Sequence, residues 1–226
     1  VFATSSAIYN RAMTLGGVTF EITYKSTAPD VIKVSVVHHK GTLKNAPKFE
    51  LNEDQGYIPE IKTGEDFAEM TSGSTKVRIK KGFDWDVEFS YKGKRLTGGA
   101  WRATSYIEEN QFRADNRINS MRDDSFWSYP ADEHNTYIRE QLTLGIGECI
   151  YGKFTTFVKN GQNVEMWNSD GGTCSDQSYK CVPFYISSNG YGVFVNSSDK
   201  VSYEIASDTV SKVSITVPGE EIEYFV

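Results

Sequence analysis

The sequence of 226 residues has no surplus of basic charge, few prolines and no long apolar run. Its 24 Lys and Arg stand against 30 Asp and Glu, and the net charge of -6 argues against a nucleic-acid partner because phosphates attract basic surfaces. No apolar stretch approaches the roughly 20 residues of a membrane helix, so we expect no membrane partner. The sequence also lacks an initiator Met and a signal peptide, which predicts a mature or trimmed form of a longer protein.

Aromatic side chains, in contrast, are abundant. Phe, Tyr and Trp make up 13% of the residues, which favours strands and surfaces that contact sugars or proteins over helical bundles. With 38% hydrophobic and 24% charged residues, 19 Gly and 6 Pro, the composition excludes a disordered or collagen-like chain. The length suits one large domain or two small ones.

Strict alternation of apolar and polar residues is the main structural signal. It predicts strands, of which the clearest are Val18–Tyr24, Phe83–Tyr91, Val201–Ile205 and Val213–Val217. Turn residues fall between such runs, and both Lys92-Gly93 and Asn189-Gly190 predict hairpin turns. Helical periodicity is almost absent, and only Gly64 to Met70 could form one short helical turn.

Many short strands with one polar and one apolar face predict two sheets packed face to face. We therefore interpret the fold as an all-β, two-sheet β-sandwich that occupies residues 1–226 as one domain. No internal repeat of about 20 to 50 residues supports a propeller or solenoid. The segment Asn110 to Glu133, rich in Asp, Asn, Arg and Ser, predicts a long surface excursion within this domain.

Residue types that carry catalysis form no constellation that the spacing alone supports. Asp84, Asp86 and Glu88 alternate with core residues, so they are better explained as a solvated strand face than as paired catalytic carboxylates. His38 and His39 follow a predicted strand, and a surface pair is favoured over a metal or proton-transfer site. Zinc-site spacing, a nucleophile elbow and a phosphate-binding glycine loop are all absent, so we expect no metal and no cofactor.

The three cysteines leave two interpretations open. Cys174 and Cys181 could close a small loop as a disulfide, which would leave Cys149 as the odd thiol, or all three could be separate thiols. The sequon that begins at Asn196 offers an N-glycosylation acceptor and points, like a disulfide, to a secreted protein. Free thiols would instead indicate a cytoplasmic location.

One segment, Asn160 to Thr173, combines Trp167, Asn168, Asp170 and two glycines. Such a loop suits a sugar, because a carboxylate accepts paired hydrogen bonds from hydroxyls while an aromatic ring covers the apolar face of the sugar. The alternative is an ordinary Asp-Gly turn beside a half-buried Trp, and composition alone favours that alternative.

Several short runs in this half of the chain form a recognisable series. They are Leu144–Gly152, Phe154-Thr155, Val158–Gln162, Trp167–Thr173, Gln177–Tyr185, Asn189–Asn196, Val201–Glu204 and Glu223–Val226. Together they strongly resemble glycoside hydrolase family 31, in the order found in its α-xylosidases. Gly41 to Leu51 and Lys76 to Gly98 match more loosely. The resemblance thus covers most of the chain and is most specific over residues 144–226.

The resemblance implies a β-sandwich of the galactose-mutarotase-like type, the N-terminal domain of a retaining α-glycosidase. Such enzymes use an Asp nucleophile and an Asp acid/base. Both lie in a (β/α)₈ barrel that would follow residue 226, so no catalytic residue is expected in this chain. The expected partners are a carbohydrate substrate and the protein's own barrel, in the same or a cleaved chain, and assembly into a homo-oligomer is left open.

The resemblance also assigns a barrel-facing loop at about residues 160–175. Asp170 would contact the substrate, and Trp167, Asn168, Gly171 and Gly172 would support the loop. The run Tyr179-Lys180 followed by Pro183-Phe184 resembles the α-xylosidase branch, which predicts release of terminal α-linked xylose from xyloglucan-type oligosaccharides. The alternatives are an α-glucosidase of the same family and a stand-alone carbohydrate-binding or mutarotase-like module.

The chain departs from the family pattern at Gly152-Lys153-Phe154, where the spacing is shorter. A deletion in a barrel-facing loop would explain this, as would residues missing from the sequence at this point. The second explanation is favoured because both flanks match the family well.

Overall fold

The structure is a computed structural model that describes residues 1–14, 18–38, 47–83, 85–100, 102–108, 136–143, 149–152, 156–167 and 181–226. These residues form strands and turns, with one 3₁₀ turn, Arg11–Thr14, as the helical element among them. In the same ranges no helix is long and apolar enough to cross a membrane. The predicted excursion at Asn110 to Glu133 lies outside the described residues, as does the segment 153–155 where the spacing departs from the family.

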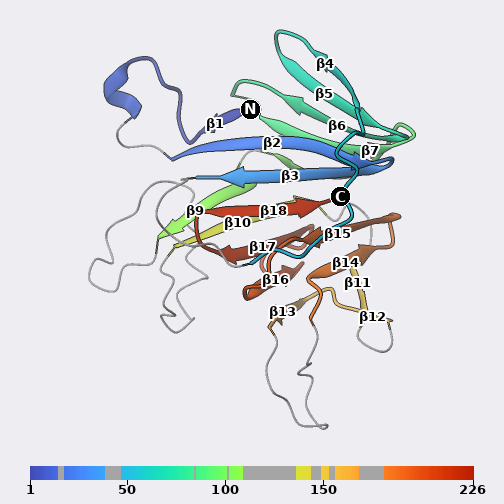
Figure 1. Ribbon diagram of the computed structural model, residues 1–226. Coiled ribbons are helices and arrows are strands. Elements are labelled where there is room, and N and C mark those ends of the chain that lie inside the picture. The colour runs from blue at the N-terminus through green and yellow to red at the C-terminus, as the bar shows by residue number, and fades with distance from the viewer. Residues whose placement is uncertain are drawn as a thin grey trace.

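The largest sheet is antiparallel and has eight strands (Figure 1). In spatial order they are β1 (Phe2–Thr4), β2 (Thr19–Ala28), β3 (Val31–Val37), β18 (Glu221–Phe225), β15 (Tyr191–Val195), β14 (Phe184–Ser187), β11 (Cys149–Gly152) and β12 (Thr156–Val158). In this order the last strand, β18, lies inside the sheet, between β3 from near the start of the chain and β15. The fold is therefore closed by contacts between residues that are distant in sequence.

Two five-stranded antiparallel sheets make up the rest of the domain. One contains β13 (Gln162–Met166), β16 (Val201–Ile205), β17 (Lys212–Pro218), β10 (Thr136–Thr143) and β9 (Thr104–Glu108). The other contains β4 (Glu60–Thr63), β5 (Phe67–Ser72), β6 (Thr75–Lys80), β7 (Asp86–Tyr91) and β8 (Lys94–Ala100). Strand β8 lies beside β10, while β6 and β17 pack against β3 and β18 of the large sheet. The predicted sandwich is confirmed, but its second layer consists of two sheets.

A single hydrophobic core joins the three sheets. Alternation produces it, because Phe20 and Ile22 on β2, and Val34 and Val36 on β3, all point inward and are buried. They meet Phe89 and other inward side chains of the opposite layer. Full burial of each such side chain contributes about 1.5–3 kcal/mol, so the alternating residues supply most of the driving force for this fold.

Turn geometry agrees with two sequence predictions. The hairpins β7–β8 and β14–β15 form as expected, with Gly93 at φ 81° and Gly190 at φ 88°, in the left-handed region that favours glycine. The short helical turn predicted at Gly64 to Met70 is wrong. Phe67 begins strand β5, which pairs on both sides with β4 and β6, and this tertiary pairing outweighs local helical preference.

The strand predicted over Phe83–Tyr91 is shorter than expected. It begins at Asp86 in the structure, and Phe83 is 78% exposed instead of facing the core. The expected polar face is confirmed for Asp86 and Glu88, which both lie within 3.7 Å of the Arg95 guanidinium near the surface. Asp84 lies outside the described residues.

Candidate functional site

The segment predicted to contact sugar leaves the sandwich between β13 and β14. Met166 ends β13 and is buried, whereas the next residue, Trp167, is half exposed. The chain returns at Cys181, whose Sγ donates a hydrogen bond to the Trp167 carbonyl oxygen at 3.1 Å. This contact closes the foot of the loop, so both ends of the segment are held at the edge of the domain.

The residues of the loop itself lie outside the described part of the chain. This applies to Asn168, Asp170, Gly171, Gly172 and Cys174. The contact of Asp170 with substrate and the disulfide between Cys174 and Cys181 therefore stay predictions. For Trp167 the structure shows a carbonyl that accepts from Cys181 and a side chain that is 50% exposed, so the residue stands at the surface beside the loop.

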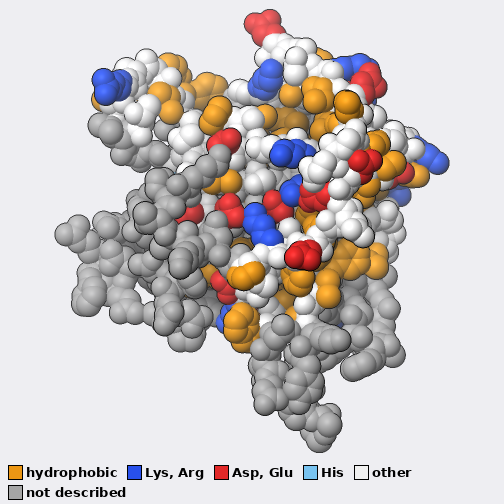
Figure 2. All heavy atoms as spheres, viewed as in Figure 1, with side chains coloured by type: hydrophobic (Ala, Val, Ile, Leu, Met, Phe, Trp, Pro, Cys, Tyr) orange, Lys and Arg blue, Asp and Glu red, His pale blue; other side chains and the backbone are white. Residues whose placement is uncertain are grey.

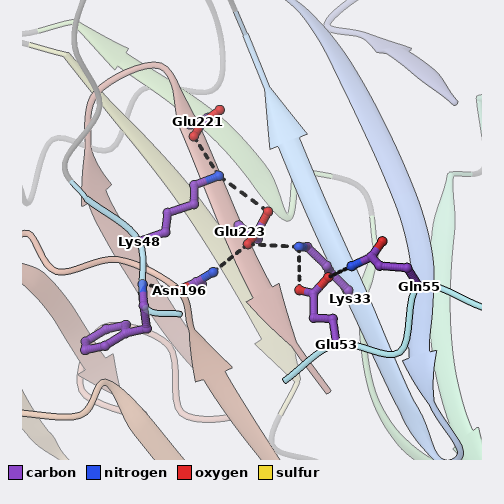
Figure 3. Close-up of polar contacts among 8 residues, drawn as sticks. Lys33, Lys48, Glu53, Gln55, Asn196, Glu221 and Glu223 are labelled. Atoms are coloured by element: carbon purple, nitrogen blue, oxygen red, sulfur yellow. Dashed lines mark hydrogen bonds and ion pairs between the residues drawn. The ribbon is translucent and has the colours of Figure 1, made fainter. Parts of the chain in front are cut away.

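The predicted glycosylation residue, Asn196, is buried in a polar network on the outer side of the large sheet (Figure 3). Its Nδ2 donates to Glu223 Oε1 at 2.7 Å, and its Oδ1 accepts from the Phe49 amide at 2.8 Å. A glycan is attached through this same nitrogen, so a glycan on the folded domain would have to displace the bond to Glu223. The structure therefore gives the predicted glycoprotein no support.

The same network fastens an irregular segment, residues 47–59, across the large sheet; we call this segment the strap. Lys48 contacts Glu221 at 2.8 Å and Glu223 at 3.4 Å, while Lys33 of β3 contacts Glu223 at 3.2 Å and Glu53 at 2.8 Å (Figure 3). Burial opposes ionisation of Glu223, but Asn196 and the two lysines outweigh it and lower its pKa. Glu223 is thus the central anion that joins the strap to β18 and β3.

Replacing Glu223 by Ala should destabilise the sandwich by about 2 kcal/mol, because it leaves the Asn196 amide and two lysines without their shared acceptor. Because the folded pKa is lowered, this stabilisation is fully present above the unfolded pKa of 4.5 and is lost as the pH falls through the folded pKa. Hydrogen exchange of β15 and β18 amides in the full-length protein measures the loss.

The matched control is Glu60→Ala, which breaks an exposed ion pair with Lys62 and should leave the stability almost unchanged because solvent screens this pair. Equal effects of the Glu60 and Glu223 substitutions would show that the network does not fasten the strap.

His38, expected to belong to a surface pair, instead joins a partly buried cluster. Its Nδ1 donates to Glu220 Oε2 at 2.5 Å, and Tyr106 donates to the other carboxylate oxygen at 3.1 Å. The His38 and Tyr106 rings stack with their centroids 3.9 Å apart. These contacts join β3, β9 and the turn before β18, so the cluster stabilises the packing of these three elements. The interpretation of His38 as a surface residue is therefore wrong. His39 lies outside the described residues.

A second titratable group that sequence reasoning missed is Glu140 of β10, which is buried between the layers. Thr104 donates to its Oε2 at 2.7 Å, yet burial dominates and raises the pKa of Glu140 to about 7. Tyr24 and Tyr224 line the same cavity, and burial together with the Glu140 charge raises the pKa of each phenol. The cavity measures about 10 Å³, enough for about one water molecule and too small for a sugar.

A larger hollow of about 540 Å³ lies near the N-terminus, between β1, β2 and the turn that precedes β7. Phe2, Phe83 and Trp85 contribute to its wall, and its described lining contains no Asp or Glu. The described part of the lining therefore offers no carboxylate pair of the kind that glycoside hydrolysis requires. Within the described ranges, no group of three or more His, Cys, Asp or Glu side chains is placed to hold a metal ion.

Taken together, the described residues define a two-layer β-sandwich, and the segment predicted to contact sugar begins directly after its strand β13. Residues 21–204 match the family model described as the glycosyl hydrolase 31 N-terminal galactose mutarotase-like domain, and the chain belongs to this family.

Two curated relatives share 37% identity with the chain. They are the alpha-xylosidase XylQ of Lactiplantibacillus pentosus, matched over 100% of this chain and 27% of the relative, and an alpha-xylosidase of Emericella nidulans, matched over 96% and 28%. The chain therefore spans little more than a quarter of the length of these relatives.

Solved structures agree on the fold. A GH31 dextranase from Flavobacterium johnsoniae in complex with glucose superimposes with a TM-score of 0.64 at 20% identity, covering 93% of this chain and 24% of that one. A GH31 alpha-xylosidase from a soil metagenome, in complex with xylose, gives a TM-score of 0.54 at 16% identity, with 92% and 29% covered. At these identities the likeness shows the shared fold alone.

Proposed function

We propose that this chain is the N-terminal β-sandwich of a retaining α-xylosidase that releases terminal α-linked xylose from xyloglucan-type oligosaccharides. The observation that carries the proposal is the 37% identity, across essentially the whole chain, to alpha-xylosidases of a bacterium and a fungus. The catalytic carboxylates would lie in the barrel of the same protein, outside residues 1–226. The carbohydrate is then bound between the barrel and the loop that begins after Trp167.

The test is hydrolysis of an aryl α-xyloside and an aryl α-glucoside by the full-length protein. Xylose lacks the hydroxymethyl group of glucose, and a pocket that closes around this missing group discriminates by about 10- to 200-fold in kcat/KM. We expect the xyloside to be preferred by at least the lower figure, and the products of an early time course to retain the α-configuration. A preference for the glucoside would instead identify an α-glucosidase.

The matched control is the chain 1–226 expressed alone, which should release neither xylose nor nitrophenol. Turnover by this fragment would overturn the placement of the chemistry in the barrel. The protein purified from its natural source can also be weighed under denaturing conditions. An intact mass close to 25.4 kDa, with no second chain of barrel size, would indicate a stand-alone sugar-binding module. Secretion stays a prediction from the sequence, since the buried amide of Asn196 lends it no support.

A further inference from the structure

The hollow of about 540 Å³ near the N-terminus lies where β1 and β9 are the outermost described strands of their sheets. β1 and the turn that precedes β7 form its walls, and Phe20 and Ile22 of β2 form its floor. We call it the β1 hollow. Its volume falls within the range of about 300–1,000 Å³ that ligand pockets occupy. Figure 2 shows hydrophobic side chains gathered at the upper left, over β1 and the neighbouring 3₁₀ turn, so this end of the domain presents an apolar surface.

Three aromatic side chains that reach solvent lie around the β1 hollow. Phe2 of β1 is 75% exposed and Phe83 is 78% exposed, while Trp85 is partly exposed and packs against the core. Large apolar side chains that gather at one place mark binding sites, whereas scattered ones carry no such meaning. Because the most exposed of these side chains are flat rings, the hollow suits the apolar face of a sugar better than a flexible fatty chain.

Polar groups stand beside these rings. Ser5 and Ser6 follow β1 and line the hollow, and a hydroxyl can both donate and accept a hydrogen bond. Lys81 Nζ donates to the Gly64 carbonyl oxygen at 2.8 Å, and because an ammonium has three N–H groups it can donate to a ligand as well. Rings that cover apolar faces, together with donors for hydroxyl oxygens, are the combination that a neutral sugar requires.

Backbone hydrogen bonds hold the walls of the β1 hollow in place. The Ile22 amide donates to the Val1 carbonyl oxygen at 2.8 Å, which fixes β1. The Lys81 amide donates to the Asp66 carbonyl oxygen at 2.8 Å, which fixes the turn before β7. A site that exists before its ligand arrives binds with a smaller loss of conformational entropy. The β1 hollow therefore needs little rearrangement to accept a ligand.

The β1 hollow is well separated from the start of the loop that follows Trp167. Thr104, which lines the hollow, begins β9 at one edge of a five-stranded sheet, whereas Trp167 follows β13 at the opposite edge. Four strand spacings of about 4.8 Å place these two edges about 19 Å apart. A saccharide in the hollow would therefore make contacts additional to the one predicted for Asp170.

We propose that the β1 hollow binds a neutral oligosaccharide, with the rings of Phe2 and Phe83 against apolar faces of its sugar units and Lys81 donating to its oxygens. The proposal rests on the proposed function for the choice of a xyloglucan as the saccharide. A second contact on one chain of sugars acts at a high effective concentration, so it raises the affinity for long xyloglucans more than the affinity for short substrates.

Native electrophoresis of the full-length protein through gels with and without xyloglucan polysaccharide tests this binding. We expect xyloglucan to retard the parent protein, and the double variant Phe2→Ala and Phe83→Ala to bind it about tenfold more weakly because two ring contacts are lost. Tyr9→Ala is the matched control, since Tyr9 is 77% exposed near the same end of the chain but is not part of the described lining. This control should be retarded as strongly as the parent protein.

Initial rates on an aryl α-xyloside separate this inference from the proposed function. The three proteins should have the same kcat/KM on this short substrate, because one sugar unit cannot be hydrolysed and occupy the hollow at the same time. A parent protein that hydrolyses the xyloside without being retarded, or a double variant retarded as strongly as the parent, would overturn the inference. A protein that hydrolyses no xyloside, yet shows retardation that the double variant loses, would refute the proposed function and retain the binding site.

Hydroxyl-radical footprinting of the full-length protein without sugar checks that the β1 hollow is open. Phe2 and Phe83 should react as readily as Tyr9, because all three rings are at least 75% exposed in the sandwich. Protection of Phe2 and Phe83 alone would show that polypeptide fills the hollow, which would also overturn the inference.

Discussion

Replacing Glu140 by Gln should stabilise the sandwich by about 3 kcal/mol at pH 8 and change its stability little at pH 4. The cause is burial, which raises the pKa of this carboxyl from 4.5 to about 7 in the folded state. The variant keeps an oxygen that accepts the hydrogen bond of Thr104, and it has no charge to place between the sheets.

The sign of this pH dependence follows from whether the folded or the unfolded chain holds the proton of Glu140 more tightly. Below pH 4.5 both the folded and the unfolded chain are protonated at Glu140, so the group has no effect on the pH dependence. Between pH 4.5 and about 7 the unfolded chain releases the proton while the folded domain retains it, so the free energy of unfolding falls as the pH rises. Above pH 7 Glu140 is ionised in both states, and the free-energy cost of burying its charge reaches its full value. The Gln side chain is uncharged and removes this cost.

Thermal unfolding of the full-length protein, together with hydrogen exchange of β10 and β17 amides, measures this effect across pH 4 to 8. Glu88→Gln is the matched control, because Glu88 lies at the surface beside Arg95 and should show no comparable gain at high pH. A Glu140→Gln variant with the same pH profile as the parent protein would show that the carboxyl is not held neutral in the core.

Alternation predicted the layers of this fold because it records which side of each strand is buried. Val34 and Val36, or Ile215 and Val217, need no distant information to be placed inward. The division of the second layer could not be predicted in this way. It depends on how β8 approaches β10, where a Cβ added to Gly99 would lie 3.4 Å from the Gln141 carbonyl oxygen, and such a contact between strands distant in sequence leaves no local pattern.

Some buried polar groups could be predicted from neighbouring residues, whereas others depend on contacts between residues distant in sequence. The bond between His38 and Glu220 joins residues 182 positions apart, so neighbouring sequence could not reveal it. The burial of Glu140, in contrast, could have been predicted from the local sequence. It shares the period-two face of Ile138 and Leu142, which are both fully buried, and this spacing places a carboxyl in the core. The role of Asp170 was accessible only through resemblance, since its local pattern fits an ordinary turn equally well.

Under the proposed function, Asp170→Ala in the full-length protein should lower kcat/KM on an aryl α-xyloside by about 10- to 150-fold while the sandwich stays folded. A hydrogen bond from a sugar hydroxyl to a carboxylate contributes about 1.5 to 3 kcal/mol, and each 1.4 kcal/mol corresponds to tenfold. The negative charge would also favour an oxocarbenium-like transition state, a smaller contribution in the same direction. Asp170→Asn, which keeps the shape and loses the charge, should fall between the parent protein and the Ala variant.

Trp167→Ala separates support of the loop from contact with sugar. Because Trp167 stands at the foot of the loop and its ring is half exposed, we expect this variant to lower both kcat/KM and the unfolding temperature, whereas Asp170→Ala should lower kcat/KM alone. The measurements are initial rates on an aryl α-xyloside and a xyloglucan oligosaccharide, together with a thermal unfolding curve for each variant. If Asp170→Ala leaves both rates unchanged, the segment is a structural turn and the substrate contact assigned to it does not exist.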